Sequence, residues 1–287
     1  MSLTSLIQHP QVREILDEIS PAVVRSWHIP TVVPSTTSSG YRQRVGIAFD
    51  YALRFEVARL SGVSAGSRWA ADYGLAIHAR VPGKTKEHAQ FERAVRDAHR
   101  YVDRYSRRSR APRPTKLCLA IHALRLAAFD PLYRAHQVFE INLEPPAGAV
   151  DEVVDLLEAA TLEDLLRLGP PILNPNFGLA SALVGGADAD MVLGNTLIEI
   201  KTVKDVCVER EYVRQLLGYA LLARRARRLG SDLPPIAGFG IYFSRHAYFV
   251  QLPPAVGGEV ALERAEDEFF SAVKAMRPSH GFRNRRS

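Results

Sequence analysis

The sequence predicts a mixed α/β protein whose core is interrupted by a large helical insertion. Two observations lead to this fold class. Apolar residues recur at helical spacing through most of residues 66–168, and only short proline- and glycine-containing segments break the pattern. After Pro170, short apolar runs typical of strands alternate with helical segments. Because alternating strands and helices share one core, we expect a mixed central sheet flanked by helices, not two independent domains.

Composition and length exclude several classes of protein. The chain has 287 residues, of which 47% are hydrophobic and 24% are charged, so wholesale disorder and fibrous repeats are excluded. No apolar run approaches the roughly 20 residues of a membrane-spanning helix, and the first residues lack the pattern of a signal peptide. We therefore expect a soluble, cytoplasmic protein without a membrane partner. Two distant cysteines, Cys118 and Cys207, provide neither a disulfide framework nor a zinc or iron–sulfur cluster.

The first part of the chain is predicted to contain a helix, a linker and a second helix. Residues 1–44 form a short helix, over about residues 1–20, and a linker rich in Pro, Ser and Thr. Residues 45–62 are predicted to be the first helix of the core, because their apolar residues form one stripe that ends at Gly62. The helical insertion then covers residues 63–169, and its last segment is acidic.

Residues 170–287 are predicted to form the α/β core and a basic C-terminal tail. The helix over residues 209–230 begins with acidic residues and ends in a basic run, as the helix dipole favours. The expected elements are strands at Met191–Leu193 and Thr196–Ile200, this helix, strands within residues 236–252 and a last helix from about Leu262 to Met276.

A hairpin in this core brings charged residues together. Its two strands are separated only by Gly194-Asn195, a pair typical of a tight hairpin turn. Counting outward from the turn sets Asp190 opposite Glu199 and Asp188 opposite Lys201, and side chains alternate between the two faces of each strand. Charged residues then share one face, and apolar residues share the other: Asp188, Asp190, Glu199 and Lys201 against Met191, Ile198 and Ile200.

These four charged residues predict a metal site. Carboxylates about 5 Å apart across strands repel one another unless a cation lies between them. Oxygen ligands of this kind favour Mg²⁺ or Mn²⁺ over Zn²⁺. A metal held by Asp190 and Glu199 would polarise a phosphate and lower the pKa of a bound water, and Lys201 would orient that water or stabilise charge on phosphorus. The structural alternative is a solvated hairpin face with a cross-strand Asp–Lys pair.

The helix that follows the hairpin carries a second polar pair. Gln215 and Tyr219 are one turn apart, so they project together from a face beside the apolar stripe. A strand ending in Glu-x-Lys and followed within one helix by Gln-x-x-x-Tyr is much rarer than either motif alone. The combination favours a functional site over a solvated hairpin.

This motif set, Asp190, Glu199-x-Lys201 and Gln215-x-x-x-Tyr219, resembles the PD-(D/E)XK nuclease superfamily, and more narrowly its RecB-like and CRISPR-associated exonuclease branch. The resemblance covers residues 170–250 and implies a restriction-endonuclease-like αβββαβ core with Mg²⁺- or Mn²⁺-dependent hydrolysis of DNA. It also implies roles for individual residues. Asp190, Glu199 and the carbonyl of Ile200 would be metal ligands, Lys201 the catalytic lysine, and Gln215 and Tyr219 residues that contact DNA or shape the site.

The chain departs from the family pattern at its first aspartate. Ala189 precedes Asp190 where relatives have proline, so Asp188 is a second candidate ligand, although the hairpin count favours Asp190. Some relatives carry a four-cysteine iron–sulfur cluster, which two cysteines cannot supply. Relatives also often use an acidic residue on the first core helix. Glu56 is the candidate here, and its alternative is an exposed glutamate beside Arg59.

Positive charge is concentrated in three arginine-rich segments. The net charge is +6, and the segments are residues 91–116, 224–228 and the tail, 277–287. Such segments suit a phosphate backbone, because each neutralised phosphate releases a counterion. Within the first segment, arginines at three- and four-residue spacing form one basic stripe: Arg93, Arg96, Arg100, Arg104 and Arg107. For this stripe the alternative is a set of ion pairs with the acidic residues 151–166. The residues of the first segment that we expect to contact DNA are Arg104, Arg107 and Arg108.

The leading hypothesis is therefore a metal-dependent deoxyribonuclease, and two other interpretations remain. A module on the same fold could bind nucleic acid without cutting it. A Gly-x-Ser-x-Gly motif at Gly62–Gly66 matches the nucleophile turn of serine hydrolases, but that turn requires a preceding strand and a helix is predicted here. Residues Asn174–Phe177 are either a loop at the mouth of the site or an ordinary turn.

Overall fold

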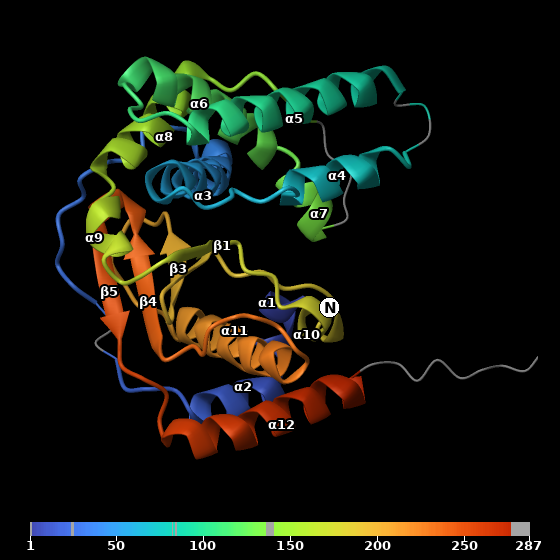
Figure 1. The fold of residues 1–287 in the computed structure, drawn as a ribbon, viewed down its shortest axis with the longest axis vertical. Coiled ribbons are helices and arrows are strands. Elements are labelled where there is room, and N and C mark those ends of the chain that lie inside the picture. The colour runs from blue at the N-terminus through green and yellow to red at the C-terminus, as the bar shows by residue number, and fades with distance from the viewer. Residues whose placement is uncertain (1, 24–25, 82, 84, 136–140, 277–287) are drawn as a thin grey trace, which may run out of the picture.

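The structure is a computed structural model that describes residues 2–23, 26–81, 83, 85–135 and 141–276 (Figure 1). The first part of the chain is helical: α1 (Leu3–Leu6), α2 (Pro10–Glu18), α3 (Ser39–Ser61), α4 (Ala70–His78), α5 (Thr85–Ser106), α6 (Arg113–Ala127), α7 (Asp130–Ala135), α8 (Ala147–Ala159) and α9 (Leu162–Leu166). The remainder contains the strands: β1 (Pro171–Leu173), α10 (Gly178–Leu183), β2 (Met191–Leu193), β3 (Thr196–Lys201), α11 (Arg210–Arg228), β4 (Gly238–Phe243), η1 (Ser244–His246), β5 (Tyr248–Leu252) and α12 (Gly258–Met276). No described helix has the length and apolarity that crossing a bilayer requires.

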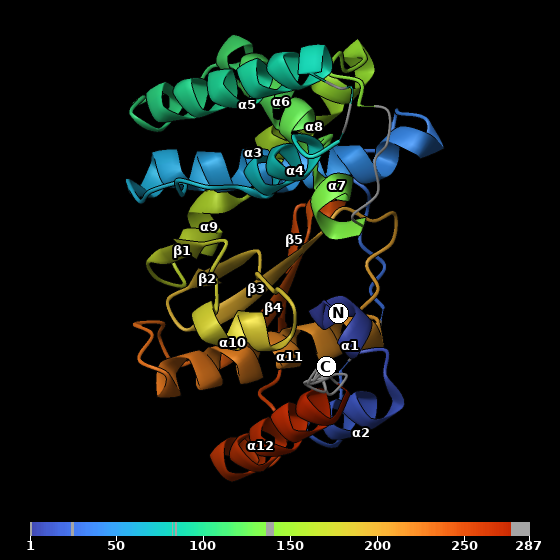
Figure 2. The same ribbon diagram turned by 90° about the vertical axis from the view of Figure 1, so that its right-hand side faces the viewer.

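The helices pack in layers on both sides of the sheet. In Figures 1 and 2, α3 lies over one face of the sheet, and α5 and α6 lie outside α3. Helix α11 covers the opposite face, and α2 and α12 pack beyond it. The predicted mixed α/β class, with a large helical region before the sheet, is therefore confirmed.

The sheet has five strands in the order β1-β2-β3-β4-β5. Strands β1, β2 and β3 pair antiparallel, β3 and β4 pair parallel, and β4 and β5 pair antiparallel. Because β3 and β4 are parallel, the carboxyl ends of both strands lie at the same edge of the sheet, and α11 forms the crossover between them. Ligand sites of α/β sheets commonly lie at such an edge.

Side-chain alternation divides the apolar residues of the sheet between two cores. The face towards α3 carries the predicted apolar set, Met191, Ile198 and Ile200. The other face carries Val192 and Leu197, which pack with residues of α11, α12 and the N-terminal helices. Because both faces of β3 are covered, its residues form an almost continuous buried run. Glu199 belongs to that buried run although it is a charged residue, and it is only 5% exposed.

Some helix boundaries differ from the predictions. The N-terminal helix is two helices, because Pro10 begins α2 at a position where a backbone N–H is not needed. The first core helix begins at Ser39, so part of the predicted linker is helical. It ends as predicted at Gly62, whose φ of 75° is left-handed and therefore suits glycine. The last helix begins at Gly258, about one turn earlier than predicted.

A buried ion pair fastens the helical region to the end of β4. Glu152 of α8 and Arg245 of η1 are 2.6 Å apart between Oε1 and Nη2. Glu152 Oε2 accepts hydrogen bonds of 2.9 Å and 3.0 Å from the backbone N–H groups of Thr36 and Thr37. Burial would raise the pKa of Glu152, but the hydrogen bonds from Arg245 and Thr36 lower it overall. Both oxygens of this buried carboxylate therefore accept hydrogen bonds.

Candidate metal site and its surroundings

The β2–β3 hairpin forms with the predicted register. Its pairs are Met191 with Ile198, Val192 with Leu197, and Leu193 with Thr196. Gly194 in the turn has a φ of 61°, a conformation that the tight turn requires and glycine adopts without strain. Asp190 directly precedes β2, and its Oδ2 accepts a 2.7 Å hydrogen bond from the backbone N–H of Ile200. The hairpin therefore brings Asp190 beside the Glu199-x-Lys201 segment.

Lys201 links this segment to α11. Its Nζ donates hydrogen bonds to Glu199 Oε1 at 2.7 Å and to Gln215 Oε1 at 3.3 Å. Gln215 in turn donates from Nε2 to the hydroxyl of Tyr219 at 3.0 Å. The Lys201 ammonium also lies 4.4 Å from the centre of the Tyr212 ring, within the range of a cation–π contact. The pair on α11 thus projects together towards the carboxylates.

Glu199 is almost fully buried, yet only one of its carboxylate oxygens is bound. Its Oε1 pairs with Lys201, whereas Oε2 has no hydrogen-bond partner within the described residues. Burial raises the pKa of Glu199, and the negative charge of Asp190 raises it further, to about 8, although Lys201 opposes this. A buried oxygen without a partner costs about 1–3 kcal/mol or more, so it requires an explanation such as an ion or a catalytic role.

Lys201 and Tyr219 both keep their protons at neutral pH. Burial would lower the pKa of Lys201, but the charge of Glu199 raises it overall. Burial raises the pKa of the Tyr219 hydroxyl, and the charges of Glu199 and Asp190 raise it further. Lys201 is therefore a cation at neutral pH. Tyr219 is only 6% exposed, so it packs around the site and presents little surface for contact with DNA.

An acidic residue that the sequence analysis missed approaches the site from α3. The charge of Asp50 contributes to raising the pKa of Glu199, and its Oδ2 lies 2.6 Å from Nη2 of Arg54. Burial would lower the pKa of Arg54, but the charge of Asp50 and, to a smaller extent, the charge of Asp190 raise it overall. The sequence did offer one signal for Asp50, since it is the only carboxylate in the largely apolar segment 45–55. A charge in such a segment is buried only where it is paired or functional.

Glu56, the predicted candidate on the first core helix, is not brought to the site. Its Oε1 and Oε2 each accept a 2.7 Å hydrogen bond from Arg59, and Oε2 accepts another of 2.6 Å from Tyr105. Burial would raise the pKa of Glu56, but these donors lower it overall. Because Arg59 and Tyr105 already bind the carboxylate, the structure corrects the choice of Glu56 as a ligand. Its alternative holds only in part, because Glu56 does pair with Arg59 but is buried and not exposed.

Asp188 lies where two pockets meet beside the site. One pocket of about 320 Å³ also includes Asn174 and Asn176, and one of about 600 Å³ also includes Tyr219. Asp188 forms an isolated bridge with Asn176, whereas the described pairing of β2 with β3 ends at Met191. The expected pairing of Asp188 with Lys201 is therefore not seen. Two residues of the loop after β1, Asn174 and Asn176, thus share a pocket with Asp188.

The arginine-rich stripe of α5 lies in the outer helical layer, and α3 separates it from the sheet (Figures 1 and 2). Its described ion pairs are local, between residues three or four positions apart, for example between Arg107, directly after α5, and Asp103 at 2.7 Å. The acidic segment 151–166 instead contacts Arg113 of α6, with Nη2 2.8 Å from Asp155 Oδ1. Pairing between the stripe and that segment is thus not found among the described ion pairs. The exposed arginines predicted to bind DNA are Arg104, Arg107 and Arg108.

The basic run at the end of α11 is bound by α12. Arg225 Nε lies 2.8 Å from Oε1 of the fully buried Glu266, and Arg228 Nη2 lies 2.8 Å from Glu263 Oε1. Arg224 also pairs with α12, through Glu259. These arginines therefore hold α11 against α12, in place of the expected contact with a DNA backbone. The basic tail, 277–287, lies outside the described residues.

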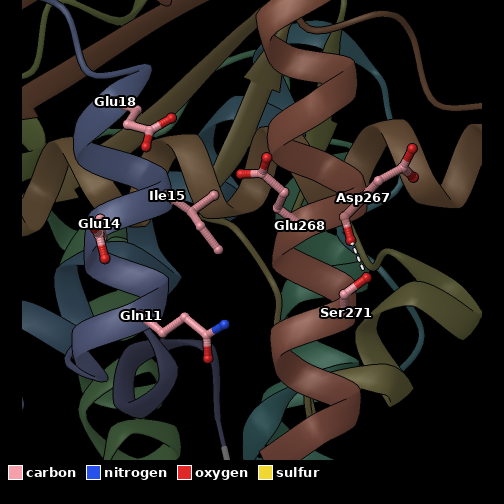
Figure 3. A pocket seen from close by; sticks show the side chains of 7 residues that line it. All are labelled: Gln11, Glu14, Ile15, Glu18, Asp267, Glu268 and Ser271. Carbon is pink, nitrogen blue, oxygen red and sulfur yellow. Dashed lines mark hydrogen bonds between the residues drawn. The ribbon is translucent and has the colours of Figure 1, made fainter.

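A further pocket, of about 440 Å³, lies between α2 and α12, away from the hairpin (Figure 3). Four of the labelled residues are acidic: Glu14, Glu18, Asp267 and Glu268. Carboxylates repel phosphate, so this pocket does not suit a nucleic acid.

The Gly-x-Ser-x-Gly motif does not form a nucleophile turn. It follows the C-terminus of α3, and Gly62 caps that helix. Ser64 is exposed, and its Oγ accepts a 3.2 Å hydrogen bond from the N–H of Gly66. A helix therefore precedes the motif, as the sequence predicted, and nothing in this turn supports a serine hydrolase.

The donors at the hairpin fit an ion such as Mg²⁺ or Mn²⁺. They are oxygens only, and Glu199 shows the unbound oxygen and raised pKa expected of a carboxylate that faces another without a cation between them. Among the described residues, no group of three or more His, Cys, Asp and Glu side chains could hold a metal. The main predicted ligands, Asp190, Glu199 and the main-chain carbonyl of Ile200, include only two carboxylates and would not form such a group. A larger set with Asp188 or Glu56 as a third carboxylate is not found among the described residues.

The comparisons with known proteins leave the family open. The resemblance to PD-(D/E)XK nucleases rests on the motif residues alone and stays a prediction. No protein-family model, no curated protein and no solved structure matches this chain.

Proposed function

We propose that this protein is a Mg²⁺- or Mn²⁺-dependent deoxyribonuclease of the PD-(D/E)XK type, similar to RecB-like and CRISPR-associated exonucleases. The order of the elements supports the proposal. Helix α3 is followed by β1, β2, β3, α11 and β4, which is the αβββαβ order of that superfamily, with α4–α9 inserted after the first helix, the short helix α10 inserted between β1 and β2, and β5 added after β4. The proposed ligands lie on the hairpin, and Gln215 and Tyr219 lie on the helix that follows it.

One observation carries the proposal. A buried carboxylate oxygen, Glu199 Oε2, has no hydrogen-bond partner in the described part of the chain, and the charge of Asp190 lies close enough to raise the pKa of Glu199. A structural glutamate at this depth would be expected to have both oxygens bound. A divalent cation between the two carboxylates would satisfy the oxygen and remove the repulsion.

The side chains around the carboxylates suit hydrolysis of a phosphodiester. A bound metal would supply Lewis-acid polarisation of the phosphate and a lowered pKa for an attacking water. Asp190 and Glu199 would hold it. Lys201, which stays protonated, would stabilise the negative charge that develops on the phosphate oxygens. Gln215 accepts a hydrogen bond from Lys201 and donates one to Tyr219, so it would position the lysine.

A module that binds nucleic acid without cutting it is the second candidate. The close pair between Lys201 and Glu199 favours it, because the lysine serves there as the counterion of a carboxylate that would otherwise bind metal. Such a module would bind DNA without a divalent metal. Glu199→Gln would change its DNA affinity and its stability only slightly.

The two candidates are separated by incubating the purified protein with linear and circular DNA and Mg²⁺ or Mn²⁺, with and without EDTA. The proposal predicts degradation that EDTA stops and that Glu199→Gln abolishes in a protein that still unfolds cooperatively. Loss of linear DNA alone would indicate an exonuclease, and nicking of circles an endonuclease. DNA binding without any metal-dependent cleavage would contradict the nuclease and support the binding module.

A further inference from the structure

A groove leads to the candidate site between the helical region and the sheet. Its two parts are the pockets of about 320 Å³ and 600 Å³ that share Tyr133, Ala187 and Asp188, so the pockets adjoin each other. Figures 1 and 2 show α4 and α7 on one side of this region, and α10 and α1 on the other. Asp188, the second candidate ligand, and Tyr219 line it, so the groove borders the candidate site.

An aromatic pair lines the first part of the groove. Tyr73 of α4 stacks on Tyr133 of α7, with 5.3 Å between the ring centres and 28° between the ring planes. Tyr73 remains 42% exposed. An exposed aromatic ring that a second ring supports is the kind of surface on which an unpaired nucleic-acid base stacks.

Polar groups that suit a nucleotide line the same pocket. Arg68 is exposed, and within the described residues its guanidinium forms no ion pair, in contrast to the arginines that bind α12. Asn174 and Asn176 add two side-chain amides. The backbone N–H of Asn174 donates a 3.0 Å hydrogen bond to the carbonyl of Asp190, which joins this pocket to the main chain of the proposed ligand.

We propose that Tyr73, supported by Tyr133, and Arg68 bind a single-stranded segment of DNA and direct it towards Asp190. Tyr73 stacks on one base, and Arg68 pairs with a neighbouring phosphate. A duplex does not fit this role, because its bases are stacked on one another and present no face to a side chain. The volume of the first pocket also lies near the lower end of the range that holds one small ligand, comparable to a single nucleotide.

This inference rests on the proposed function for the fate of the strand, but its test does not require cleavage. Affinity for fluorescently labelled oligo-dT, for a duplex of the same length and for oligo-rU is measured in EDTA by fluorescence anisotropy. The variants are Tyr73→Ala, Tyr73→Phe and Arg68→Gln. Phe270→Ala is the matched control, because Phe270 is a part-exposed aromatic residue of α12, away from the groove, and its ring centre lies 4.5 Å from Cζ of Arg225 on α11.

Tyr73→Ala is expected to weaken binding of oligo-dT by about 5- to 150-fold, the range for loss of one base–aromatic stack. Tyr73→Phe keeps the ring and should bind as the parent does. Arg68→Gln should reduce the salt slope of binding by about 0.7, the value for one phosphate contact on a single strand. Phe270→Ala should leave both quantities unchanged, and thermal unfolding of each variant checks that it is folded.

Parent-like binding of oligo-dT by folded Tyr73→Ala would overturn the proposal, as would tighter parental binding of duplex or of oligo-rU. These outcomes are distinct from failure of the nuclease. If Tyr73→Ala loses affinity while the parent does not cut DNA with Mg²⁺, the stacking site stands and the proposed function fails. If the parent cuts DNA and Tyr73→Ala binds and cuts equally well, the function stands and the stacking site fails.

Discussion

Two glutamates of this protein, Glu152 and Glu199, are buried to nearly the same extent in opposite surroundings. Glu152 is 2% exposed, and Arg245 and backbone N–H groups bind both of its oxygens. Glu199 is 5% exposed, and one of its oxygens has no partner among the described residues. Burial raises the pKa of both carboxyls, so the donors and charges around each decide the outcome: the pKa of Glu152 is lowered and that of Glu199 is raised to about 8.

The difference separates a carboxylate that is fully paired from one that we propose to bind a metal. A carboxylate that only stabilises the fold acquires enough donors to offset its desolvation, as Glu152 does. A carboxylate kept with an unbound oxygen next to a second negative charge destabilises the protein until something binds there. The pairing of each oxygen, and not burial alone, therefore separates the two roles.

The largest expected effect is the loss of DNA cleavage in the Glu199→Gln variant. The amide has the same size but lacks the charge that would hold a metal, so we expect DNA cleavage to fall by at least about a thousandfold, the order of magnitude for losing a major electrostatic contact. Asp190→Ala should have the same effect. DNA binding should be retained or strengthened, because a charge that repels phosphate is gone. Cleavage of linear DNA with Mg²⁺ measures the effect, and a parental rate in either variant would refute the assignment.

Glu152→Gln should act on stability and not on chemistry. The change leaves the Arg245 guanidinium buried without its counterion, which costs about 3–5 kcal/mol of unfolding free energy when a buried pair is broken. Urea denaturation measures the loss, and the cleavage rate per folded molecule should not change. Glu163→Gln is the control, because Glu163 is an exposed glutamate of the same helical region. Equal stability of the two variants would remove the contrast between Glu152 and Glu199.

Lys201→Ala is expected to lower kcat by about a hundredfold and to change DNA affinity much less. A protonated lysine beside the carboxylates stabilises charge mainly in the transition state, so its loss affects turnover. Lys201→Arg should not restore turnover, because a planar guanidinium presents its charge differently. Single-turnover cleavage and equilibrium binding separate the two effects. A loss confined to affinity would make Lys201 an ordinary phosphate contact.

The two glutamates should also give the metal-free protein opposite dependences on pH. Glu199 has a folded pKa near 8, above its ordinary value of 4.5, so the folded state holds an extra proton between these values. Its contribution to stability is present below about pH 4.5 and is lost as the pH rises towards 8. Glu152 has a lowered pKa, so its contribution is present above pH 4.5 and is lost as the pH falls below that value.

Urea denaturation in EDTA at several pH values tests this difference. Relative to the parent, Glu199→Gln should gain stability as the pH rises from about 5 to 8, and adding Mg²⁺ should reduce that gain, because the metal stabilises only the parent. A constant difference between the two proteins over this range would show that Glu199 is not protonated in the metal-free site.

The smallest effect is expected from the arginine stripe of α5. Combined replacement of Arg104, Arg107 and Arg108 by Ala should lower the salt slope of DNA binding by about 0.7–0.9 for each phosphate contact that is lost, without changing the metal requirement. Thermal stability should change little, because the acidic segment 151–166 pairs elsewhere. A marked loss of stability with an unchanged slope would instead assign these arginines to the fold.

The prediction of the hairpin succeeded because it depends only on nearby residues. The turn at Gly194-Asn195 and the alternation of the flanking strands determine which residues face each other, and β2–β3 pairs accordingly. One helical turn likewise sets the spacing of Gln215 and Tyr219, which are hydrogen-bonded. Glu56 was chosen because it lies off the apolar stripe of its helix, but that pattern does not show what packs against that face.

The arginine-rich segments show the same limit. The runs at 91–116 and 224–228 have the same sequence signature, yet the carboxylates of α12 bind arginines of the second run, whereas those at the end of α5 stay exposed. A charge run does not reveal its partner, because that partner can lie anywhere in the sequence.

The sequence by itself determined the α/β class, the hairpin register and the grouping of Asp190, Glu199 and Lys201, since these follow from periodicity and short-range spacing. Only the tertiary structure decided that Asp50 approaches Glu199, that Glu152 is fully paired, and which arginines remain available. These depend on contacts between residues far apart in the chain, such as Glu152 and Arg245, which are 93 positions apart. The electrostatics of a buried group depend on every neighbour that replaces water, and packing alone chooses those neighbours.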